Sequence, residues 1–287
     1  MSNVLITGCS SGFGFLTTKA LAARGHTVVA TMRDPEGRNA ENAARLRAEC
    51  EGAPGAVHIV ALDVTDDASV AAAVAEAIER VGDLDAVVNN AGFGHGGILE
   101  TFSVDELREV FEVNVFGPHR VNRAVLPHLH ARKAGLIVHV SSSIGRLLFP
   151  FFGAYGPSKY ALEALAETYQ MELHGTGIEV TIVQPGGYLT EWFANMKRPE
   201  NVERAAAYGP LAEAAAGFWA DPEGTMDAEI ADPQHVADGI VEVIEAPAGE
   251  RPQRKVIDPM MGEAVEAINH TIAATKAKIL EAMGFGG

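Results

Sequence analysis

Short apolar runs rich in valine and isoleucine recur along the chain, and segments with helical periodicity separate them. Continuous apolar runs of this length are typical of strands that are buried on both faces of a parallel sheet. The seven runs are Val4–Thr7, Thr27–Thr31, Val57–Leu62, Ala86–Asn89, Leu136–Ser141, Glu179–Gln184 and Arg254–Ile257. Their alternation with helices predicts an α/β fold, a doubly wound (Rossmann) and mostly parallel seven-stranded sheet with helices on both faces.

No linker, repeat or low-complexity stretch divides the chain, so we expect a single catalytic domain over residues 1–260. Residues 188–230 fit the alternation poorly, since they contain Pro199 and Gly209-Pro210 between short Ala-rich pieces. They follow the sixth run, at the carboxyl edge where open α/β sheets bind ligands, and we predict a substrate-binding lid there. Residues 261–287 are expected to form a helix that packs on the domain or on a neighbouring subunit.

The chain is strongly acidic, with 22 Lys and Arg against 38 Asp and Glu and a formal net charge of −16. Such a surface repels phosphate backbones and anionic lipid heads, which argues against nucleic-acid and membrane-surface binding. Cys9 and Cys50 are the only cysteines, too few for a disulfide scaffold or a cysteine-built metal site. Because the sequence shows no apolar run of ~18 residues and no basic, apolar leader, a cytoplasmic location is expected.

A glycine-rich turn, Gly8–Gly14, follows the first predicted strand and precedes a helix. Its spacing is Gly-x3-Gly-x-Gly, at Gly8, Gly12 and Gly14. Glycines allow a tight turn and close backbone approach to a pyrophosphate at the helix N-terminus. By itself the turn also fits a plain strand–helix connection, but its place directly after the first strand favours a nucleotide cofactor.

The end of the second strand bears on which cofactor binds. An acidic residue there would bind the ribose 2′-hydroxyl of NAD, but Met32 takes that place and Asp34 comes one residue too late. Arg33 offers a guanidinium suited to a 2′-phosphate, and Ser10 adds a hydroxyl donor. These residues predict NADP(H), although Arg33 also fits a solvated loop cation. Asp63 ends the third strand, where it would contact the adenine or cap the next helix.

Tyr155 and Lys159 carry the strongest chemical signal. Four residues apart on a helix, they share one face. Lowering a tyrosine pKa from about 10 to near 7 takes roughly 4 kcal/mol, which an ammonium ~4 Å away supplies at an effective dielectric constant of ~20. Ser142 follows the fifth strand, where its hydroxyl would bind a substrate oxygen. Asn114 lies inside a helical segment that asparagine disfavours, which indicates a kink or a bound water.

Together these motifs resemble the short-chain dehydrogenase/reductase family from Val4 to about Thr190. The motifs, in chain order, are Thr7-Gly8-x3-Gly12-x-Gly14, Asn89-Asn90-Ala91-Gly92, Asn114, Ser142, Tyr155-x3-Lys159 and Pro185-Gly186. Within the family the glycine loop and the Val29–Asp34 segment are most similar to the branch of 17β-hydroxysteroid dehydrogenase type 1 and the retinol dehydrogenases. Pro157 inside the Tyr-x3-Lys motif and the long segment after Thr190 depart from the family pattern.

The resemblance implies a role for each matching residue. Tyr155 would be the general acid in ketone reduction and the base in alcohol oxidation, and Lys159 would lower its pKa and hold the nicotinamide ribose. Ser142 would bind the substrate oxygen, and Asn114 would hold a water in a proton relay. The implied cofactor-binding residues are Gly8, Ser10, Ser11, Gly12, Phe13, Gly14, Arg33, Asp63, Val64, Asn90, Ala91, Gly92, Tyr155, Lys159, Pro185, Gly186 and Thr190. A homodimer or homotetramer is expected on the same ground.

The substrate is expected to be a mainly apolar secondary alcohol or ketone. Aromatic residues gather in the segments that should face the nicotinamide, although core packing would also account for part of them. Arg146 and Lys197-Arg198 are interpreted as rim residues. The predicted substrate-binding residues are Ser142, Phe149, Phe152, Tyr155, Tyr188 and Trp192, with Phe151, Phe193 and Met196 nearby.

Other residues receive structural interpretations. The histidines at 95, 119, 128, 130 and 139 are spread over several elements, so no metal site is predicted. Cys9 has no nearby base and is expected to be a small filler. Besides an NADP-dependent alcohol dehydrogenase or carbonyl reductase, three alternatives remain: a non-catalytic NADP-sensing regulator, an epimerase or dehydratase, and a 3-oxoacyl thioester reductase, whose acidic carrier a chain at −16 would repel.

Overall fold

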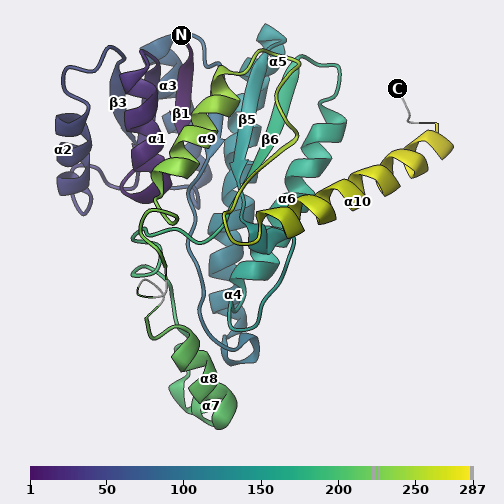
Figure 1. Ribbon diagram of the computed structural model, residues 1–287. Helices are drawn as coiled ribbons and strands as arrows, with labels where there is room; N and C mark the ends of the chain where they lie inside the picture. Colours follow the sequence, from purple (N-terminus) through teal and green to yellow (C-terminus); the bar gives the residue numbers. More distant parts are fainter. Residues whose placement is uncertain (222–223, 225, 285–287) are drawn as a thin grey trace.

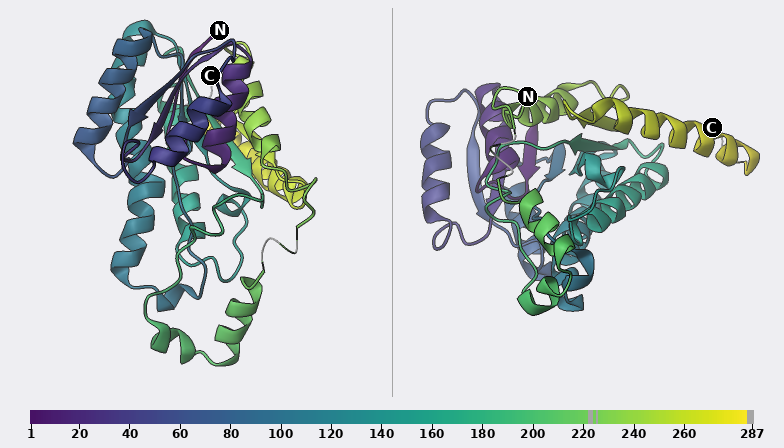
Figure 2. Two further views of the ribbon diagram at one scale, coloured as in Figure 1. Left: turned by 90° about the vertical axis from the view of Figure 1, so that its left-hand side faces the viewer. Right: turned by 60° about the horizontal axis from the view of Figure 1, so that its bottom comes forward.

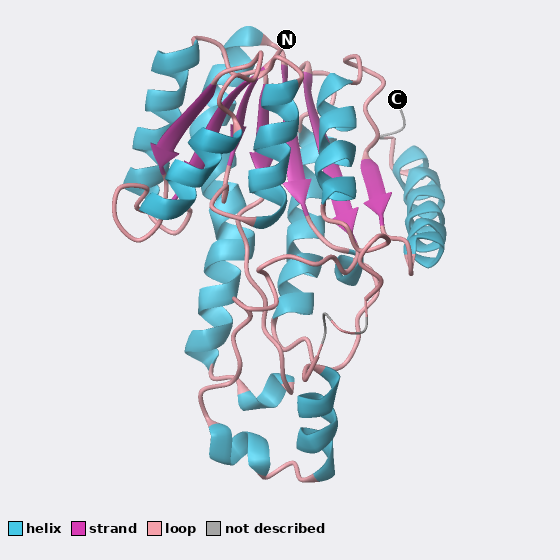
Figure 3. Ribbon diagram, turned by 60° about the vertical axis from the view of Figure 1, so that its left-hand side comes forward, coloured by secondary structure: helices cyan, strands magenta, loops and turns pink. Residues whose placement is uncertain are grey.

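A sheet of seven parallel strands organises the chain in the computed structural model, which describes residues 1–221, 224 and 226–284. The strands are β1 (Asn3–Ile6), β2 (Thr27–Met32), β3 (Val57–Ala61), β4 (Ala86–Asn89), β5 (Gly135–Val140), β6 (Ile178–Pro185) and β7 (Arg254–Ile257). Their order is β3-β2-β1-β4-β5-β6-β7, and the arrows in Figure 3 all run toward one edge. The predicted fold is confirmed, and each strand ends within one residue of its expected place.

Helices cover both faces of the sheet (Figure 1). One face carries α1 (Gly12–Ala23), α2 (Ala40–Glu49) and α9 (Gln234–Glu245), and the other carries α3 (Asp67–Val81), α5 (Gly117–Arg132) and α6 (Tyr155–Glu172). Strand side chains alternate between these faces. In β1, Val4 and Ile6 pack toward α1 and α9, whereas Leu5 packs toward α3 and α5. Both faces are therefore apolar, which is why the strands appear in the sequence as unbroken apolar runs.

The strand order changes direction next to β1, whose neighbours are β2 on one side and β4 on the other. The loops that leave β1 and β4 therefore diverge to opposite faces and open a crevice at the carboxyl edge. Residues Thr7–Gly14 and Asn90–Gly92 lie in these two loops. The glycine turn predicted to bind phosphate is thus at the place where doubly wound sheets bind ligands.

The segment before α5 is more irregular than the sequence indicated. Ser103 forms a capping box with Glu106 at the start of α4 (Val104–Phe111). From Glu112 to Phe116 the chain forms a π-helical turn that leads into α5. Such a turn inserts a residue into the helix and is frequent at functional sites. It contains Asn114, so the predicted kink is present.

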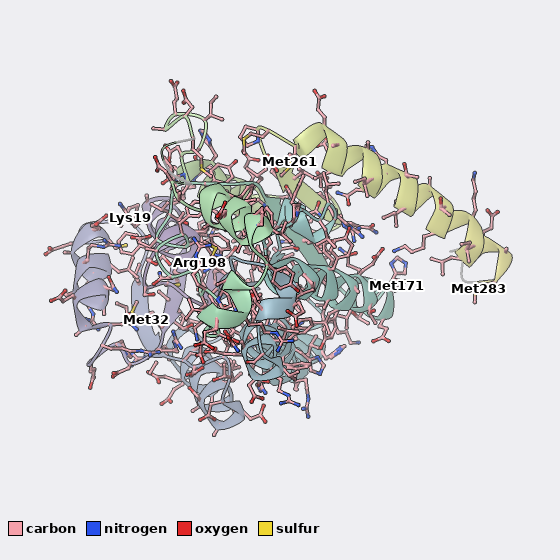
Figure 4. The ribbon with its side chains drawn as sticks, turned by 90° about the horizontal axis from the view of Figure 1, so that it is seen from below. Lys19, Met32, Met171, Arg198, Met261 and Met283 are labelled. Carbon is pink, nitrogen blue, oxygen red and sulfur yellow. The ribbon has the colours of Figure 1, made fainter. Side chains whose placement is uncertain are left out.

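Two elements extend from the domain. The first, α7 (Val202–Ala206) with α8 (Pro210–Phe218), lies beyond the carboxyl edge of the sheet in the predicted lid, whose residues 222–223 and 225 are outside the described part (Figure 2). The second, α10 (Gly262–Ala282), begins against β7 and projects from the body between the labelled Met261 and Met283 in Figure 4. Of its residues only Val265 is buried, and residues 285–287 of the predicted tail are outside the described part.

Among the described helices, none combines the length and apolarity needed to cross a bilayer.

Candidate active site

The glycine loop after β1 is shaped by close backbone contacts. Gly8 has φ +74°, and a Cβ on it would lie 2.8 Å from the Cα of Ala91. A Cβ on Gly14 would lie 2.5 Å from the carbonyl oxygen of Gly8. The N-cap residue of α1, Ser11, makes no side-chain hydrogen bond to the first helical turn. The loop therefore presents backbone N–H groups at the positive end of the helix, a donor set suited to a pyrophosphate.

Asn90 fastens this loop to the end of β4. Its amide Nδ2 donates to the carbonyl oxygens of Thr7 at 2.8 Å and of Gly8 at 3.1 Å. The backbone N–H groups of Asn90 and Ala91 both donate to the Thr7 hydroxyl at 3.0 Å. The Asn90 side chain thus holds the shape of the cofactor site. Across the loop, a Cβ on Gly12 would be 3.7 Å from the Cβ of Thr190, so the predicted contact Thr190 lies beside the glycines.

The three residues at the end of β2 that bear on the cofactor differ in exposure and contacts. The Met32 side chain is buried, and the Asp34 carboxylate accepts hydrogen bonds from the backbone N–H groups of Gly37 and Arg38. Asp34 is therefore engaged in its own turn, while Arg33 is exposed. Asp63 accepts hydrogen bonds from the N–H and the hydroxyl of Thr65 within its own turn. It does not cap the next helix, because the N-cap of α3 is Asp66, whose carboxylate accepts the N–H groups of Ala68 and Ser69.

A second arginine, absent from the sequence prediction, joins this group. Burial raises the pKa of the Asp63 carboxyl, but the Thr65 hydrogen bonds and the charges of Arg33 and Arg38 outweigh it and leave the pKa below its usual value. Both guanidiniums are thus within electrostatic range of one carboxylate at the rim of the cleft. In the sequence, only the position of Arg38 four residues after Asp34 could have indicated that it belongs to this group.

Tyr155 and Lys159 occupy the first turns of α6 and face the sheet. The Lys159 ammonium donates to the carbonyl oxygen of Val140 at 2.9 Å and lies 5.7 Å from the centroid of the Tyr155 ring. A Cβ on Gly92 would be 3.8 Å from the Lys159 Nζ, which places this ammonium at the loop after β4. The helical spacing therefore brings both groups to the cleft as predicted.

Asn114 reaches the same place from the π-helical turn. Its Oδ1 accepts the backbone N–H of Phe93 at 3.1 Å, and its Nδ2 donates to the carbonyl oxygen of Phe93 and to the Ser158 hydroxyl, both at 3.0 Å. These bonds join the loop after β4 to α6. The amide therefore lies beside Lys159, where a proton relay would need it.

Ser142 follows β5, and its hydroxyl donates to the carbonyl oxygen of Pro185 at 3.3 Å. Burial raises the pKa of Tyr155 to about 12, and a hydrogen bond with Ser142 opposes that rise. The direction is opposite to the lowering toward 7 that the Tyr155 and Lys159 spacing predicted, because the loss of water around the phenol dominates. Burial lowers the pKa of Lys159 to about 8, and the charge of Glu163 opposes that fall. At pH 7 Tyr155 is therefore a neutral phenol that can donate a proton, beside a mainly charged ammonium.

An aromatic cluster covers Tyr155. The ring centroid of Trp192 is 5.0 Å from that of Tyr155, and Trp219 packs on Phe152 with the centroids 4.8 Å apart. The Trp192 ring packs directly on the backbone at Gly94, where an added Cβ would lie only 2.0 Å from the ring. Phe152 and Trp192 were predicted to bind substrate, whereas Trp219 was missed. Its signal would have been the aromatic pair Phe218-Trp219 after an Ala-rich helix.

Several predicted site residues lie elsewhere. Tyr188 is buried against Phe13 in the core, and its hydroxyl donates to the carbonyl oxygen of Ile257, so it does not line the aromatic cluster. Phe149 is 40% exposed. Arg146 was interpreted as a rim residue, which is wrong: its side chain is 9% exposed and faces Glu163. The reason is that the turn after Ser142 directs Arg146 toward α6.

The remaining predictions concern cations, thiols and histidines. Lys197 pairs with Glu109 at 2.5 Å, and the guanidinium of Arg198 lies 5.4 Å from the Trp219 ring centroid. Cys9 is fully buried, and burial raises the pKa of its thiol to about 12, as expected of an inert filler. Within residues 1–221, 224 and 226–284, no group of three or more His, Cys, Asp or Glu side chains is arranged to hold a metal ion.

These features fit a nicotinamide dinucleotide. The uncapped start of α1 offers donors for the pyrophosphate, and Gly8 and Gly14 leave no room for a Cβ where the chain must pass closely. Lys159 and Asn114 lie at Gly92, in the loop after β4, and Arg33 lies exposed directly after β2, at the same edge of the sheet. The residues present would thus hold a nucleotide along this edge, with Tyr155 and Lys159 at the loop after β4.

Comparison with known proteins agrees with this geometry. Residues 2–201 match the family model of the short chain dehydrogenases, so the chain belongs to that family of oxidoreductases. It is 40% identical over 186 residues to an uncharacterized oxidoreductase, YusZ, of Bacillus subtilis, with 65% of each chain covered. It is 37% identical over 192 residues to a 3-ketodihydrosphingosine reductase of Bacteroides thetaiotaomicron, with 67% of this chain and 66% of the relative covered. The match thus spans just under two thirds of these two relatives.

Solved structures share the fold over nearly the whole chain. A short chain dehydrogenase/reductase from Burkholderia phymatum in complex with NAD is 29% identical, with a TM-score of 0.76 over 96% of this chain and 95% of that one. An alcohol dehydrogenase from the archaeon Thermococcus sibiricus, complexed with 5-hydroxy-NADP, is 25% identical, with a TM-score of 0.72 over 90% and 96%. Similar proteins therefore bind either NAD or NADP.

Proposed function

We propose that this protein interconverts a mainly apolar secondary alcohol and its ketone with NADP(H), using Tyr155 as the general acid and base. The observation that carries the proposal is the meeting of Tyr155, Lys159, Ser142 and Asn114 at the inner end of a nucleotide-binding crevice. When bound, the nicotinamide supplies or accepts the hydride. The protein's part is to bind the substrate oxygen and to move one proton.

Each residue has a distinct task at that oxygen. The Tyr155 hydroxyl is neutral at pH 7, since burial raises its pKa to about 12, and it donates its proton to the developing alkoxide of a ketone. The Ser142 hydroxyl donates a second hydrogen bond to the same oxygen. The Lys159 ammonium, mainly charged because its pKa is about 8, stabilises the tyrosinate that remains. Asn114 orders the chain around Lys159 through its bonds to Phe93 and Ser158.

The preference for NADP(H) rests on the end of β2. Met32 is buried where an acidic residue would repel a 2′-phosphate, Asp34 is engaged by Gly37 and Arg38, and Arg33 is exposed beside the crevice. A guanidinium binds a phosphate with charge-assisted hydrogen bonds. We assign the 2′-phosphate to Arg33, with Arg38 as a second cation within range.

The apolar substrate rests on the aromatic cluster over Tyr155. Trp192, Phe152 and Trp219 form walls that gain ~25 cal/mol for each Å² of apolar surface they bury. A ring-containing ketone should therefore bind better than a short-chain one. Residues 188–230 are the proposed lid, because Trp192 and Trp219 both belong to this segment.

We also propose a homodimer or homotetramer in the cytoplasm. The faces of residues 104–129 and 161–173 are the expected interfaces, and they expose Val104, Phe116 and Met171. Light scattering at micromolar concentration tests this assembly, and a monomer would contradict it.

The test of the activity is a matrix of acetone-sized, aryl and polycyclic ketones and alcohols with NADPH and NADH, followed at the nicotinamide absorbance. We expect turnover with NADPH and the highest kcat/KM for the aryl or polycyclic substrates. A preference for small or anionic substrates would contradict the substrate class. Tight NADPH binding without turnover of any member would instead support a cofactor-sensing regulator.

A further inference from the structure

One turn beyond Lys159, α6 carries a buried carboxylate that the proposed chemistry does not use. Glu163 is 1% exposed and lies between two guanidiniums from other elements. The Arg146 Nε, from the turn after β5, is 3.4 Å from its Oε2, and the Arg254 Nε, from β7, is 3.2 Å away. A carboxylate is taken this far from water only at a cost, and the two guanidiniums supply the opposite charge that such a buried group needs beside it.

A pair of amides fixes the direction of the hydrogen bond to Glu163. The Asn269 Nδ2, on α10, donates to the Gln184 Oε1 at 2.7 Å. With its oxygen engaged, the Gln184 amide can only donate from the other end, and its Nε2 donates to the Glu163 Oε1 at 2.8 Å. This chain of amides requires Glu163 to be an acceptor. It therefore fixes Oε1 as an acceptor and links α10 to α6.

Lys159 is the group that needs such a charge. It is 5% exposed, and its one hydrogen-bond acceptor in the described structure is the neutral carbonyl oxygen of Val140. An ammonium in this position is penalised by its loss of water unless an opposite charge lies near. Glu163, four residues further on the same helix face, is the nearby carboxylate whose charge acts on Lys159.

We infer that Glu163 is a positioning residue that keeps the Lys159 ammonium charged and thereby sets the pH range in which the site works. The inference rests on the proposed function only for what the charged ammonium does in turnover. The charge itself can be measured without cofactor or substrate.

Other charged groups around Glu163 are arranged to hold this balance. Glu167, the next acidic residue on α6, lies 3.8 Å from Arg146 and 3.4 Å from Arg254, and it also pairs with Lys276 of α10. His139, on β5, faces Lys159, and burial lowers its pKa to about 3, so it is neutral above pH 5. The cluster thus holds two carboxylates, Glu163 and Glu167, and three cations, so its net charge is positive and the loss of Glu163 would leave Lys159 among more uncompensated cations. Of the two carboxylates, Glu163 is the one nearer to Lys159 along α6.

The experiment is a titration of the full chain with 13C-labelled lysine, followed by NMR between pH 6 and 11. The chain has seven lysines, and the Lys159 signal is assigned by its loss in Lys159→Met. We expect a midpoint of about 8 for Lys159 in the parent. In Glu163→Gln, which keeps the size and an acceptor oxygen, the midpoint should fall by about one pH unit or more.

Glu167→Gln is the matched control, because it removes a carboxylate that contacts the same two arginines but lies a further turn from Lys159. Its Lys159 midpoint should stay at the parent value. An unchanged midpoint in Glu163→Gln, or an equal fall in Glu167→Gln, would overturn the inference. If Glu163→Gln does not fold, the double variant Glu163→Gln/Arg254→Gln removes one charge of each sign, and a fall of the midpoint is expected there too.

Kinetics separates this inference from the proposed function. In ketone reduction by the parent, kcat/KM should decline above about pH 8, and in Glu163→Gln the decline should begin about one pH unit lower. A shifted NMR midpoint without a shifted rate profile would contradict the role proposed for Lys159 in turnover, while the effect of Glu163 on the ammonium would stand. An unshifted midpoint would contradict the effect of Glu163 whatever the rates show.

Discussion

The indole ring of Trp192 lies over the phenol ring of Tyr155, with the centroids 5.0 Å apart and the planes inclined by 59°. Trp192 belongs to the segment after β6, whereas Tyr155 begins α6. The aromatic cluster thus joins α6 to the proposed lid. A substrate that reaches the Tyr155 hydroxyl must pack against this indole or displace it.

Trp192→Ala should lower kcat/KM for aryl ketones about tenfold and leave acetone-sized ketones nearly unchanged. A bulky substrate loses roughly 60 Å² of apolar contact, worth about 1.5 kcal/mol, and a small one does not reach the missing ring. Steady-state kinetics with both substrates measures the ratio. Phe193→Ala is the control, because Phe193 packs on Trp192 and Trp219 and has no ring contact with Tyr155 among those described. An equal loss for small and aryl ketones would contradict a wall role for Trp192.

Tyr155→Phe should abolish turnover and leave the Kd for NADPH within about twofold, since only the transferred proton is removed. Lys159→Ala should weaken both, because its ammonium is assigned to the cofactor and to the tyrosinate. Tyr160→Phe serves as the control: Tyr160 is the next tyrosine on α6, and its hydroxyl donates to the carbonyl oxygen of Arg146 outside the cleft. The mechanism would be wrong if Tyr155→Phe kept most of the activity.

The sequence predicted the parts of the protein that local patterns determine. Strands buried on both faces are mainly apolar, so β1 to β6 stand out as runs rich in valine and isoleucine. The Tyr155 and Lys159 pair follows from helical spacing alone. The same rule extends one step further to Glu163, which lies on the face shared by Tyr155 and Lys159, and this signal was available in the sequence.

Residues whose position depends on the path of a loop could not be predicted. Tyr188 turns into the core against Phe13, and Arg146 turns toward α6, because the segments after β6 and β5 bend in ways that no periodic pattern records. Trp219 reaches the site from a position 64 residues after Tyr155 in the chain. Its contact with Phe152 depends on how α8 docks, which is a property of tertiary packing.

Arg33→Ala should weaken NADPH binding by about 1.5–3 kcal/mol, roughly 10- to 150-fold in Kd, and barely change NADH binding. The reason is that the guanidinium has no partner on a ribose that lacks the 2′-phosphate. Fluorescence titration with both cofactors gives the two constants. Arg47→Ala, on the exposed side of α2, is the control and should change neither. Equal losses for NADPH and NADH would show that Arg33 has a structural role instead.

Two buried histidines should make the fold sensitive to mild acid. His139, which lies 3.3 Å from the Asn122 amide, has its pKa lowered by burial from 6.5 to about 3, and His95, stacked on Phe102, has its pKa lowered from 6.5 to about 4. The unfolded chain therefore binds protons below pH 6.5 that the folded chain does not. The free energy of unfolding should fall by up to about 1.4 kcal/mol per pH unit for each histidine between pH 6.5 and 5.

Urea denaturation at pH 7, 6 and 5 measures this slope. His139→Gln should be less stable than the parent at pH 7, because a packed ring is lost, but its stability should decline with acid less steeply by about 1.4 kcal/mol per pH unit. His130→Gln, at an exposed position of α5, should keep the slope of the parent. If His139→Gln loses stability with falling pH as steeply as the parent does, His139 is not the group that takes up the proton on unfolding.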